Sequence, residues 1–263
     1  MSNTNSIGVI GAPYDKNSTF LRGPALAPAR IREALYCESA NMSTESCRDL
    51  GQVDSIHLLD DLEIHQFPDD IERGIGSILD KFDRVITLGG DHSITYPVIK
   101  AFSRKYKKLN ILHLDAHCDL YHFFDNNHYS HASPFARIME EQLAQRLVQV
   151  GIRTLTPHQK EQAEKFNVEI IDMNHWENIE NIVFDGPVYL SLDIDVLDPA
   201  FAPGISHYEP GGATTRQVIQ VIQNIKATLV GADIVELNPA RDISDMTAMV
   251  AAKFLKEIID RML

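Results

Sequence analysis

The sequence is poor in cysteine, and its few cysteines show no pattern that disulfides or a metal would use. Cys37, Cys47 and Cys118 are the only three among 263 residues, and no two of them form a CxxC pair. An odd and scattered set of cysteines indicates free thiols in a reducing compartment. We therefore expect a cytoplasmic protein.

Long apolar runs are also lacking. A transmembrane helix needs about 20 consecutive apolar residues, and no stretch of the sequence approaches that length. The first residues, MSNTN, carry none of the basic charge that begins a signal peptide. We expect neither a membrane partner nor a targeting segment.

Positive charge is in short supply. The 24 Lys and Arg residues are scattered and face 37 Asp and Glu residues, which gives a formal net charge of −13. Such a surface repels phosphate backbones, so we expect no nucleic acid partner. The acidic excess fits ordinary solubility, with attraction of a cationic substrate as the alternative.

No linker, repeat or low-complexity tract interrupts the chain, so we expect one domain over residues 1–263. Short apolar runs alternate with stretches of helical periodicity, which predicts an α/β fold, a three-layer α/β/α sandwich around a mostly parallel sheet. The last helix is predicted from the apolar residues between Val250 and Leu263. The expected strands are residues 7–10, 84–88, 110–115, 147–150, 168–171, 188–195 and 228–236.

Two of the expected strands end in clustered charge. In residues 111–119, ILHLDAHCD, strand alternation predicts Asp115, His117 and Asp119 on one face. In residues 191–199, SLDIDVLDP, the same alternation predicts Asp193 and Asp195 together. A single Asp of this kind fits a solvated strand end or a helix cap. Burial of four carboxylates side by side is prohibitive unless cations neutralise them, so the pattern favours a metal site.

A further imidazole, His92, follows an apolar run in the segment LGGDHS. Four carboxylates and two imidazoles without a thiolate suit Mn²⁺ better than structural Zn²⁺, and shared carboxylates suit a pair of ions. A metal pair lowers the pKa of bound water and presents it to an electrophilic carbon, which predicts hydrolysis. The pair Gly89 and Gly90 lies outside any phosphate-binding motif and indicates close backbone approach.

Three segments together resemble the signature motifs of the ureohydrolase superfamily, which contains the arginases and agmatinases. They are GGDHS at 89–93, DAHCD at 115–119 and SLDIDVLDP at 191–199. The resemblance runs nearly end to end. Three further stretches are similar to plant-type arginases: NSTFLRGPALAPARIREA, YSHASPFARIME, and AFAPGISHYEPGG followed by VGADIVELNPARD. It implies the arginase-like fold, hydrolysis of a small cationic guanidino substrate, and a homo-oligomer, either a trimer or a hexamer.

The resemblance also implies a division of ligands between two Mn²⁺ ions per subunit. Asp115 and Asp193 would be shared by both ions. The first ion would take His92, Asp115, Asp119 and Asp193, and the second would take His117, Asp115, Asp193 and Asp195.

Three catalytic roles follow from the same resemblance. Asp119 would hydrogen-bond the attacking water, His131 would pass a proton to the leaving amine, and Glu236 would bind the guanidinium by charge-assisted hydrogen bonds. Considered alone, His131 fits a surface residue at a helix start. Cys118, between two of the implied ligands, fits either plain packing or a redox-sensitive thiol.

Substrate choice depends on the end of the substrate that lies far from the metals. Candidates for binding that end are Asn126, Asn127 and Ser130 in the loop 120–130, although Asn-rich loops also form simple turns. The first hypothesis is an arginase that converts L-arginine to ornithine and urea. The alternatives are an agmatinase that yields putrescine and urea, another guanidino-acid hydrolase, a formimidoyl or amide C–N hydrolase, and a non-catalytic metal-binding protein.

Overall fold

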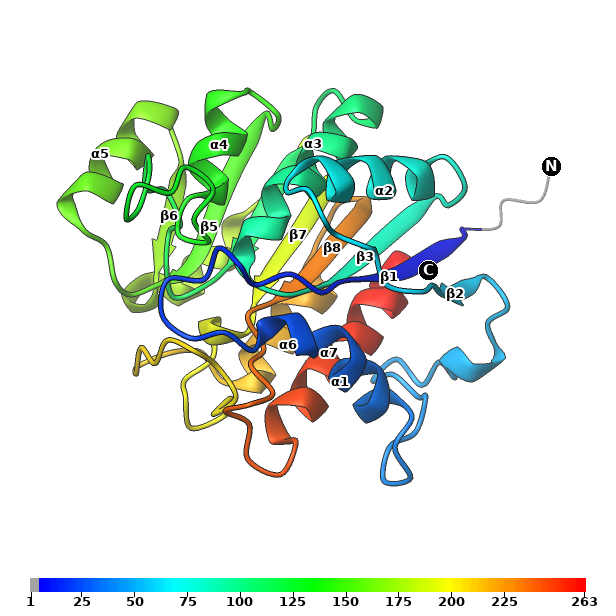
Figure 1. Cartoon of the computed structure of the whole chain (residues 1–263). Coiled ribbons are helices and arrows are strands. Elements are labelled where there is room, and N and C mark those ends of the chain that lie inside the picture. The colour runs from blue at the N-terminus through cyan, green and yellow to red at the C-terminus, as the bar shows by residue number, and fades with distance from the viewer. Residues whose placement is uncertain (1–4) are drawn as a thin grey trace.

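Eight strands form one sheet in which every neighbouring pair is parallel (Figure 1). The structure is a computed structural model that describes residues 5–263. The strand order is β2-β1-β3-β8-β7-β4-β5-β6. The strands are β1 Ile7–Ala12, β2 Ile56–Leu58, β3 Arg84–Gly89, β4 Asn110–Leu114, β5 Arg146–Ile152, β6 Glu169–Asp172, β7 Val188–Asp193 and β8 Leu229–Val235.

Helices cover both faces of the sheet and complete three layers, as the sequence predicts (Figure 1). One face is covered by α2 Asp69–Leu79, α3 Thr95–Lys105, α4 Pro134–Glu140 and α5 Pro157–Phe166. The other is covered by α1 Ala27–Leu35, α6 Thr215–Asn224 and α7 Met246–Met262. Short 3-10 segments are η1 Pro24–Leu26, η2 Leu50–Gln52, η3 His92–Ile94, η4 Met173–Asn181 and η5 Ile194–Val196.

The sheet separates two hydrophobic cores. Leu190 of β7 packs in the core beneath α7, which contributes Phe254. Its neighbour Tyr189 points to the opposite face, where it meets Phe102 of α3. Because alternate residues of each central strand are buried on opposite faces, these strands read as continuous apolar runs. Each fully buried large side chain contributes about 1.5–3 kcal/mol.

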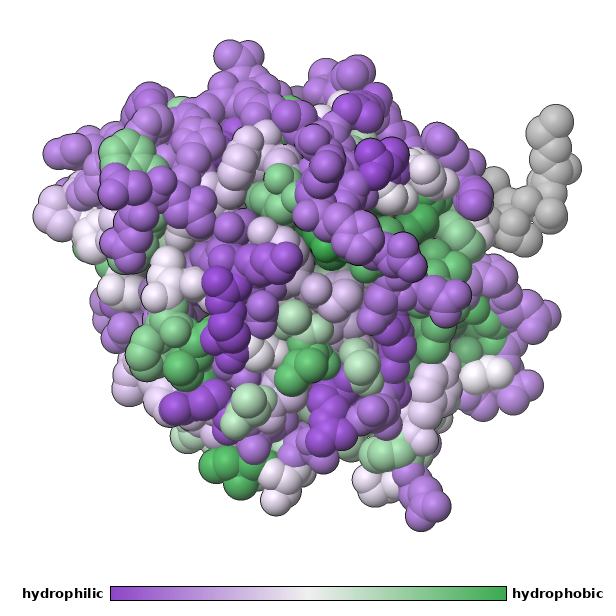
Figure 2. Space-filling model, viewed as in Figure 1, coloured by the Kyte–Doolittle hydropathy of each residue, from purple (hydrophilic) through white to green (hydrophobic). Residues whose placement is uncertain are grey.

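On the surface in the same view, hydrophobic residues occur as several separate groups among hydrophilic ones (Figure 2).

The last helix was predicted correctly, with its apolar stripe buried and closing one layer over the sheet. Of the helices in residues 5–263, none combines the length and the apolar composition that a membrane crossing requires.

Two differences from the predicted strands have a physical reason. The edge strand β2, Ile56–Leu58, was missed because three partly exposed residues are too few to show a periodicity. The strand predicted for residues 188–195 ends at Asp193, since the Oδ1 of Asp193 accepts the backbone N–H of Asp195 at 2.8 Å and starts the turn η5. The carboxylates at this strand end therefore belong to a capped turn.

The strand order places four chemically important strand ends side by side. Strands β3, β8, β7 and β4 are consecutive neighbours in the middle of the sheet. All are parallel, so their carboxyl ends lie at one edge, where open α/β sheets bind ligands.

Candidate metal centre and active site

Each of the four central strands delivers a charged or ligand-type residue to the same edge. His92 lies on η3 soon after β3, and Asp115 directly follows β4. Asp193 is the last residue of β7, and Glu236 directly follows β8. The exposed fraction of these side chains' residues is between 0% and 5%. Their convergence is therefore a consequence of strand order.

The Nδ1 atom of His92 faces three carboxylates. It lies 3.1 Å from the Oδ2 atoms of Asp115, Asp119 and Asp193. It is buried and makes no hydrogen bond within residues 5–263. A buried nitrogen without a hydrogen-bond partner, surrounded by three carboxylate oxygens, fits the donor set of a metal cation.

A second group of the same composition adjoins the first. The Nδ1 atom of His117 lies 3.0 Å from Asp195 Oδ2 and 3.4 Å from Asp115 Oδ1. Asp115 thus presents one oxygen to each group. The structure brings all six predicted ligands together and is able to hold metal at this edge. The sharing of Asp193 between two ions stays a prediction.

The backbone route to this cluster differs from the predicted one. Strand β4 ends at Leu114, so strand alternation does not align Asp115, His117 and Asp119. A loop aligns them instead: the Asp115 Oδ1 accepts the His117 backbone N–H at 2.5 Å. Asp119 has a left-handed φ of 48°, which turns its side chain back toward the cluster.

The electrostatics of the cluster call for added positive charge. Burial, together with Asp195 and Asp115, raises the pKa of Asp193 well above its usual range. Burial and Asp115 also raise the pKa of Asp195. Although burial lowers the pKa of His117, the Asp195 and Asp115 carboxylates raise it to about 12. Metal cations would relieve the same repulsion without protons.

Next to the cluster, Glu236 and His131 form a buried pair. Glu236 Oε1 lies 2.7 Å from His131 Nδ1 and accepts the backbone N–H of His92 at 2.9 Å. The left-handed φ of Glu236, 65°, directs its side chain back over the strand ends. Burial lowers the pKa of His131, but Glu236 outweighs burial and raises it to about 9.

Asp91 and Ser93 hold the turn that carries His92. Asp91 Oδ1 accepts the backbone N–H of Ser93 at 3.1 Å and caps η3. Its Oδ2 accepts the Asn17 backbone N–H at 3.1 Å and the Ser18 hydroxyl at 3.1 Å. Asp91 therefore fastens the loop after β1 to the turn after β3.

The two metal-binding groups and the Glu236–His131 pair open into one cavity of about 170 Å³. The lining combines charged and neutral residues. Within the described chain, the cavity lining includes no Lys or Arg side chain. The neutral part of the lining consists of Thr19, Tyr121, Phe124, Ala132, Thr154, Thr156 and Gln159.

The three residues predicted to contact the far end of the substrate are not part of this lining. Asn127 donates from Nδ2 to Asn17 Oδ1 at 3.1 Å and accepts the Tyr129 backbone N–H at 2.9 Å. Ser130 Oγ accepts a backbone N–H within the loop, and Asn126 is exposed with a left-handed φ of 58°. These side chains shape the loop, in the way that turn-forming residues do.

Sequence reasoning missed the neutral residues of the cavity. Thr154 and Thr156 follow β5, so the expectation that ligands lie beyond the carboxyl ends of strands applies to them as well. Gln159 lies in the first turn of α5 and is 4% exposed. His207 also lines the cavity.

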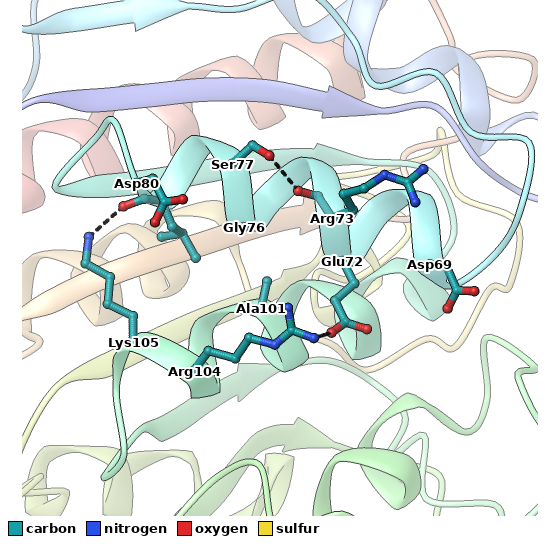
Figure 3. A pocket seen from close by; sticks show the side chains of 10 residues that line it. Asp69, Glu72, Arg73, Gly76, Ser77, Asp80, Ala101, Arg104 and Lys105 are labelled. Atoms are coloured by element: carbon teal, nitrogen blue, oxygen red, sulfur yellow. Dashed lines mark hydrogen bonds and ion pairs between the residues drawn. The ribbon is translucent and has the colours of Figure 1, made fainter.

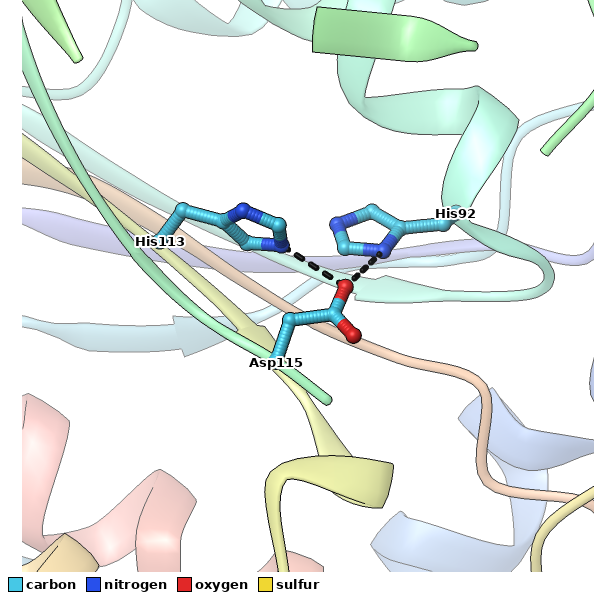
Figure 4. Close-up of side chains that lie close together, drawn as sticks. All are labelled: His92, His113 and Asp115. Atoms are coloured by element: carbon cyan, nitrogen blue, oxygen red, sulfur yellow. Dashed lines mark hydrogen bonds and ion pairs between the residues drawn. The ribbon is translucent and has the colours of Figure 1, made fainter. Parts of the chain in front are cut away.

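Another residue that sequence reasoning missed is His113, whose ring points toward Asp115 from the side opposite His92 (Figure 4). Its Nε2 atom is 2.8 Å from Asp115 Oδ2. Gln149 Nε2 lies 2.6 Å from the Cys118 carbonyl oxygen, to which it donates, and 3.0 Å from His113 Nδ1. An amide N–H directed at Nδ1 leaves the ring proton on Nε2, so His113 donates to Asp115. His113 lies two residues before Asp115, and this spacing was the feature of the sequence that could have identified it.

A larger cavity of about 890 Å³ lies between α2 and α3, away from these residues (Figure 3). Two of its basic residues are held by local contacts: Arg104 binds Glu72, and Lys105 Nζ donates to the Leu79 carbonyl at 2.8 Å. None of the predicted site residues lines it. The chemistry-bearing residues therefore belong to the smaller cavity.

Comparison with known proteins agrees with this geometry. The model of the arginase family matches residues 5–260. "Arginase 1, mitochondrial" of Arabidopsis thaliana is 45% identical over 273 residues, which cover 96% of this chain and 80% of that protein. An agmatinase of Bacillus anthracis is 30% identical over 268 residues, which cover 97% of this chain and 91% of that protein.

Solved structures show the same relationship. An arginase from Medicago truncatula has a TM-score of 0.92 at 41% identity, covering 98% of this chain and 88% of that one. The match extends over nearly the whole three-layer sandwich, including the strands that carry the cluster. The chain belongs to the arginase family.

Proposed function

We propose that the protein is an arginase, which hydrolyses the guanidino C–N bond of L-arginine and releases ornithine and urea. One observation carries the proposal. Two groups of imidazole and carboxylate donors share Asp115, and the Glu236–His131 pair opens into the same cavity. The similarity to plant arginases supports arginine as the substrate.

We propose Mn²⁺ as the metal. The donors are carboxylate oxygens and imidazole nitrogens, and no thiolate contributes, since the nearby Cys118 is buried and burial raises the pKa of its thiol well above its usual range. His92 and His117 would each bind one ion, and Asp115 would bind both. A bound pair of metal ions would lower the pKa of a water molecule and polarise the substrate.

Glu236 is placed to bind the guanidinium. Its carboxylate is 5% exposed and lies in the cavity lining. Burial raises the pKa of Glu236, but His131 outweighs burial and lowers it, so the group carries a negative charge at neutral pH. A planar cation can bind to such a carboxylate through charge-assisted hydrogen bonds. Glu236 thus orients the carbon that is attacked.

His131 is placed to deliver the proton that the leaving amine needs. With a pKa of about 9 it holds a proton at neutral pH. Its Nδ1 faces Glu236, and its Nε2 lies 2.8 Å from the hydroxyl oxygen of Thr19. When the guanidinium binds to Glu236, its positive charge offsets that of the carboxylate. Glu236 then stabilises the proton on His131 less strongly. Transfer from His131 to the amine then becomes easier.

Agmatinase is the second candidate, and the lack of a Lys or Arg in the described cavity lining favours it. Agmatine lacks the α-carboxylate of arginine, and no Lys or Arg of the described lining is available to neutralise a carboxylate. Arginine would have to use neutral donors there, namely the hydroxyls of Thr154 and Thr156 and the amide of Gln159. The greater identity to plant arginases, 45% against 30% for the agmatinase, places arginine first.

The test is a urea-release assay with Mn²⁺ on arginine, agmatine, 4-guanidinobutyrate and 3-guanidinopropionate. We expect kcat/KM for arginine to exceed that for agmatine at least tenfold, a difference of about 1.4 kcal/mol in transition-state binding. A reversed ratio would identify an agmatinase. Absence of urea from all four substrates would refute the ureohydrolase proposal.

We also propose a homo-oligomer, either a trimer or a hexamer, in the cytoplasm. The resemblance to oligomeric ureohydrolases supports the first part, and the scattered free cysteines support the second. Light scattering coupled to size-exclusion chromatography measures the subunit number, and a monomer would contradict the proposal. Cell fractionation tests the compartment.

A further inference from the structure

The ring of His92 makes its hydrogen bond on the side away from the carboxylate cluster. Nε2 lies 3.0 Å from Ser191 Oγ, in the interior of the sheet. Nδ1, on the other side of the ring, faces Asp115, Asp119 and Asp193. A neutral imidazole carries one proton, and only the nitrogen without it can bind a metal. The partner of Nε2 therefore affects whether Nδ1 is available.

Ser191 in turn donates its hydroxyl proton to a buried carboxylate. Ser191 Oγ lies 2.7 Å from Asp233 Oδ1, and the two residues are register partners on β7 and β8. Asp233 Oδ2 accepts the hydroxyls of Tyr189 and Thr95, each at 2.9 Å. Asp233 is 0% exposed, and within residues 5–263 it forms no ion pair with Lys, Arg or His. Three hydroxyl donors thus surround an acceptor-only group.

The direction of this chain of hydrogen bonds is fixed by its buried end. Burial raises the pKa of Asp233, but the hydroxyls of Ser191, Tyr189 and Thr95 all donate to it and favour its charged form, in which the Ser191 proton points to Asp233. Ser191 then offers a lone pair to His92, and Nε2 of His92 must carry the ring proton. Nδ1 is left with its lone pair directed at the three carboxylate oxygens.

We infer that Asp233 and Ser191 are positioning residues that hold His92 in the metal-binding tautomer. The inference rests on the metal-dependent function proposed above. Without Asp233, the Ser191 hydroxyl is free to rotate and donate to Nε2, which leaves the proton on Nδ1 and directs N–H at the ion. A buried carboxylate costs free energy that a packed apolar residue would not, and the fixed tautomer is the benefit.

Four variants separate this role from packing. Ser191→Ala removes the acceptor of the His92 proton, and Asp233→Asn adds an N–H beside Ser191, so its hydroxyl direction is no longer fixed. Thr95→Val and Tyr189→Phe are the controls, since they remove donors from the other oxygen of Asp233 and leave the Ser191 link intact. All four are loaded with Mn²⁺, then challenged with EDTA, and retained metal is measured by mass spectrometry.

We expect Ser191→Ala and Asp233→Asn to bind Mn²⁺ about 10–100-fold more weakly than the wild type, as is usual when a ligand's hydrogen-bond partner is lost. The controls should bind within about threefold of the wild type. Equal losses in the controls and the test variants would show a packing effect and overturn the inference. Wild-type affinity in both test variants would also overturn it.

A spectroscopic readout tests the tautomer itself. In the demetallated protein, long-range ¹H–¹⁵N NMR distinguishes a proton on Nδ1 from one on Nε2. Without metal, the three carboxylates beside Nδ1 favour a proton on that nitrogen as well, so the diagnostic signal is the Nε2 proton. We expect a hydrogen-bonded Nε2–H signal of His92 in the wild type and in Thr95→Val, and its loss or a marked shift in Ser191→Ala. An unchanged Nε2–H signal in Ser191→Ala would refute the inference while leaving the proposed function intact. A wild-type protein that binds no Mn²⁺ would instead refute the proposed function.

Discussion

The Nδ1 atom of His131 lies 2.7 Å from the Oε1 atom of Glu236, so the proposed proton donor and the carboxylate proposed to bind the guanidinium share a hydrogen bond. The same Oε1 accepts the backbone N–H of His92. In the proposed mechanism, substrate binding, the proton on His131 and the position of the predicted ligand His92 therefore all depend on this one oxygen atom. Substitution of Glu236 should therefore change substrate binding, proton transfer and metal binding to different degrees.

Glu236→Gln should lower kcat/KM for arginine by about 100-fold and leave the metal content unchanged. The amide loses the charge that binds the guanidinium, and removal of one partner of a buried charge pair costs about 2–5 kcal/mol. Its Oε1 can still accept the His92 N–H, so the ligand stays in place. Steady-state kinetics and metal analysis measure both. Glu161→Gln, on the exposed side of α5, is the control. Loss of metal from the Glu236 variant would contradict the assigned role.

Asp193→Asn should lose Mn²⁺ and activity together, and yet unfold at a higher temperature than the metal-free wild type. Asp193 is buried beside Asp195 and Asp115, and removal of one of several close negative charges relieves repulsion. Thermal unfolding in excess chelator, with Asp185→Asn as an exposed control, measures the effect. A lower unfolding temperature would mean that Asp193 is held by favourable contacts rather than by the metal.

Metal removal should destabilise the wild type and spare Asp193→Asn. A ligand that binds only the folded state stabilises it by about 2.7 kcal/mol at a free concentration of 100 Kd. Unfolding by urea, with and without Mn²⁺, gives the difference for each protein. Equal stabilisation of both proteins by Mn²⁺ would place the bound ion elsewhere.

His131 should make stability fall as the pH rises from about 6.5 to about 9. Glu236 raises the pKa of His131 to about 9, above its usual value near 6.5. The pair therefore stabilises the fold fully below the unfolded pKa and loses that contribution as the pH rises through the folded pKa. At about 1.36 kcal/mol per pKa unit, the loss is at most about 3 kcal/mol.

Urea unfolding of metal-free protein at pH 6, 7.5, 9 and 10 measures this dependence. His131→Gln should make the fall smaller and leave the part that His117 contributes in metal-free protein, whereas His175→Gln, which changes an exposed histidine, should leave the whole curve as in the wild type. A fall of the same size in the His131 variant would assign the pH dependence to other groups.

Thr154→Val should raise KM for arginine about tenfold and change KM for agmatine less than twofold. A neutral hydrogen bond contributes about 0.5–1.5 kcal/mol, and only arginine has a carboxylate to accept one from this hydroxyl. Asn126→Ala is the control, because Asn126 is exposed and outside the cavity lining. If Asn126→Ala raised KM for arginine and Thr154→Val did not, the loop residues would be the specificity determinants.

Much of the fold could be predicted because its signals are local. The apolar runs of the central strands and the stripe of α7 depend on periodicities that the sequence shows directly. The edge strand β2 could not be predicted, since its three residues gain their conformation from pairing with β1. The sequence correctly predicted that Asp115, His117 and Asp119 cluster. The reasoning assumed a strand that runs through all three residues, whereas β4 ends at Leu114.

The candidate site was predictable where residue type alone states the chemistry, as with His92 and the aspartates. It was not predictable where ordinary residues gain a role from their neighbours. Asp233 reads as an unremarkable strand residue, and its relation to His92 passes through a serine on another strand. Asn126 is exposed and lies outside the cavity lining, so its contact with the substrate stays a prediction.

Strands β7 and β8 lie between β3 and β4 although they come last in the sheet's chain order. The bond between His92 and Glu236 spans 144 residues of sequence. Contacts of such separation require the closure of long loops, which slows folding. A growing chain that ends before β8 already contains all six predicted metal ligands, but it lacks the strand that lies between β3 and β7. We therefore expect metal uptake to be one of the last events in the maturation of this protein, after the whole sheet has assembled.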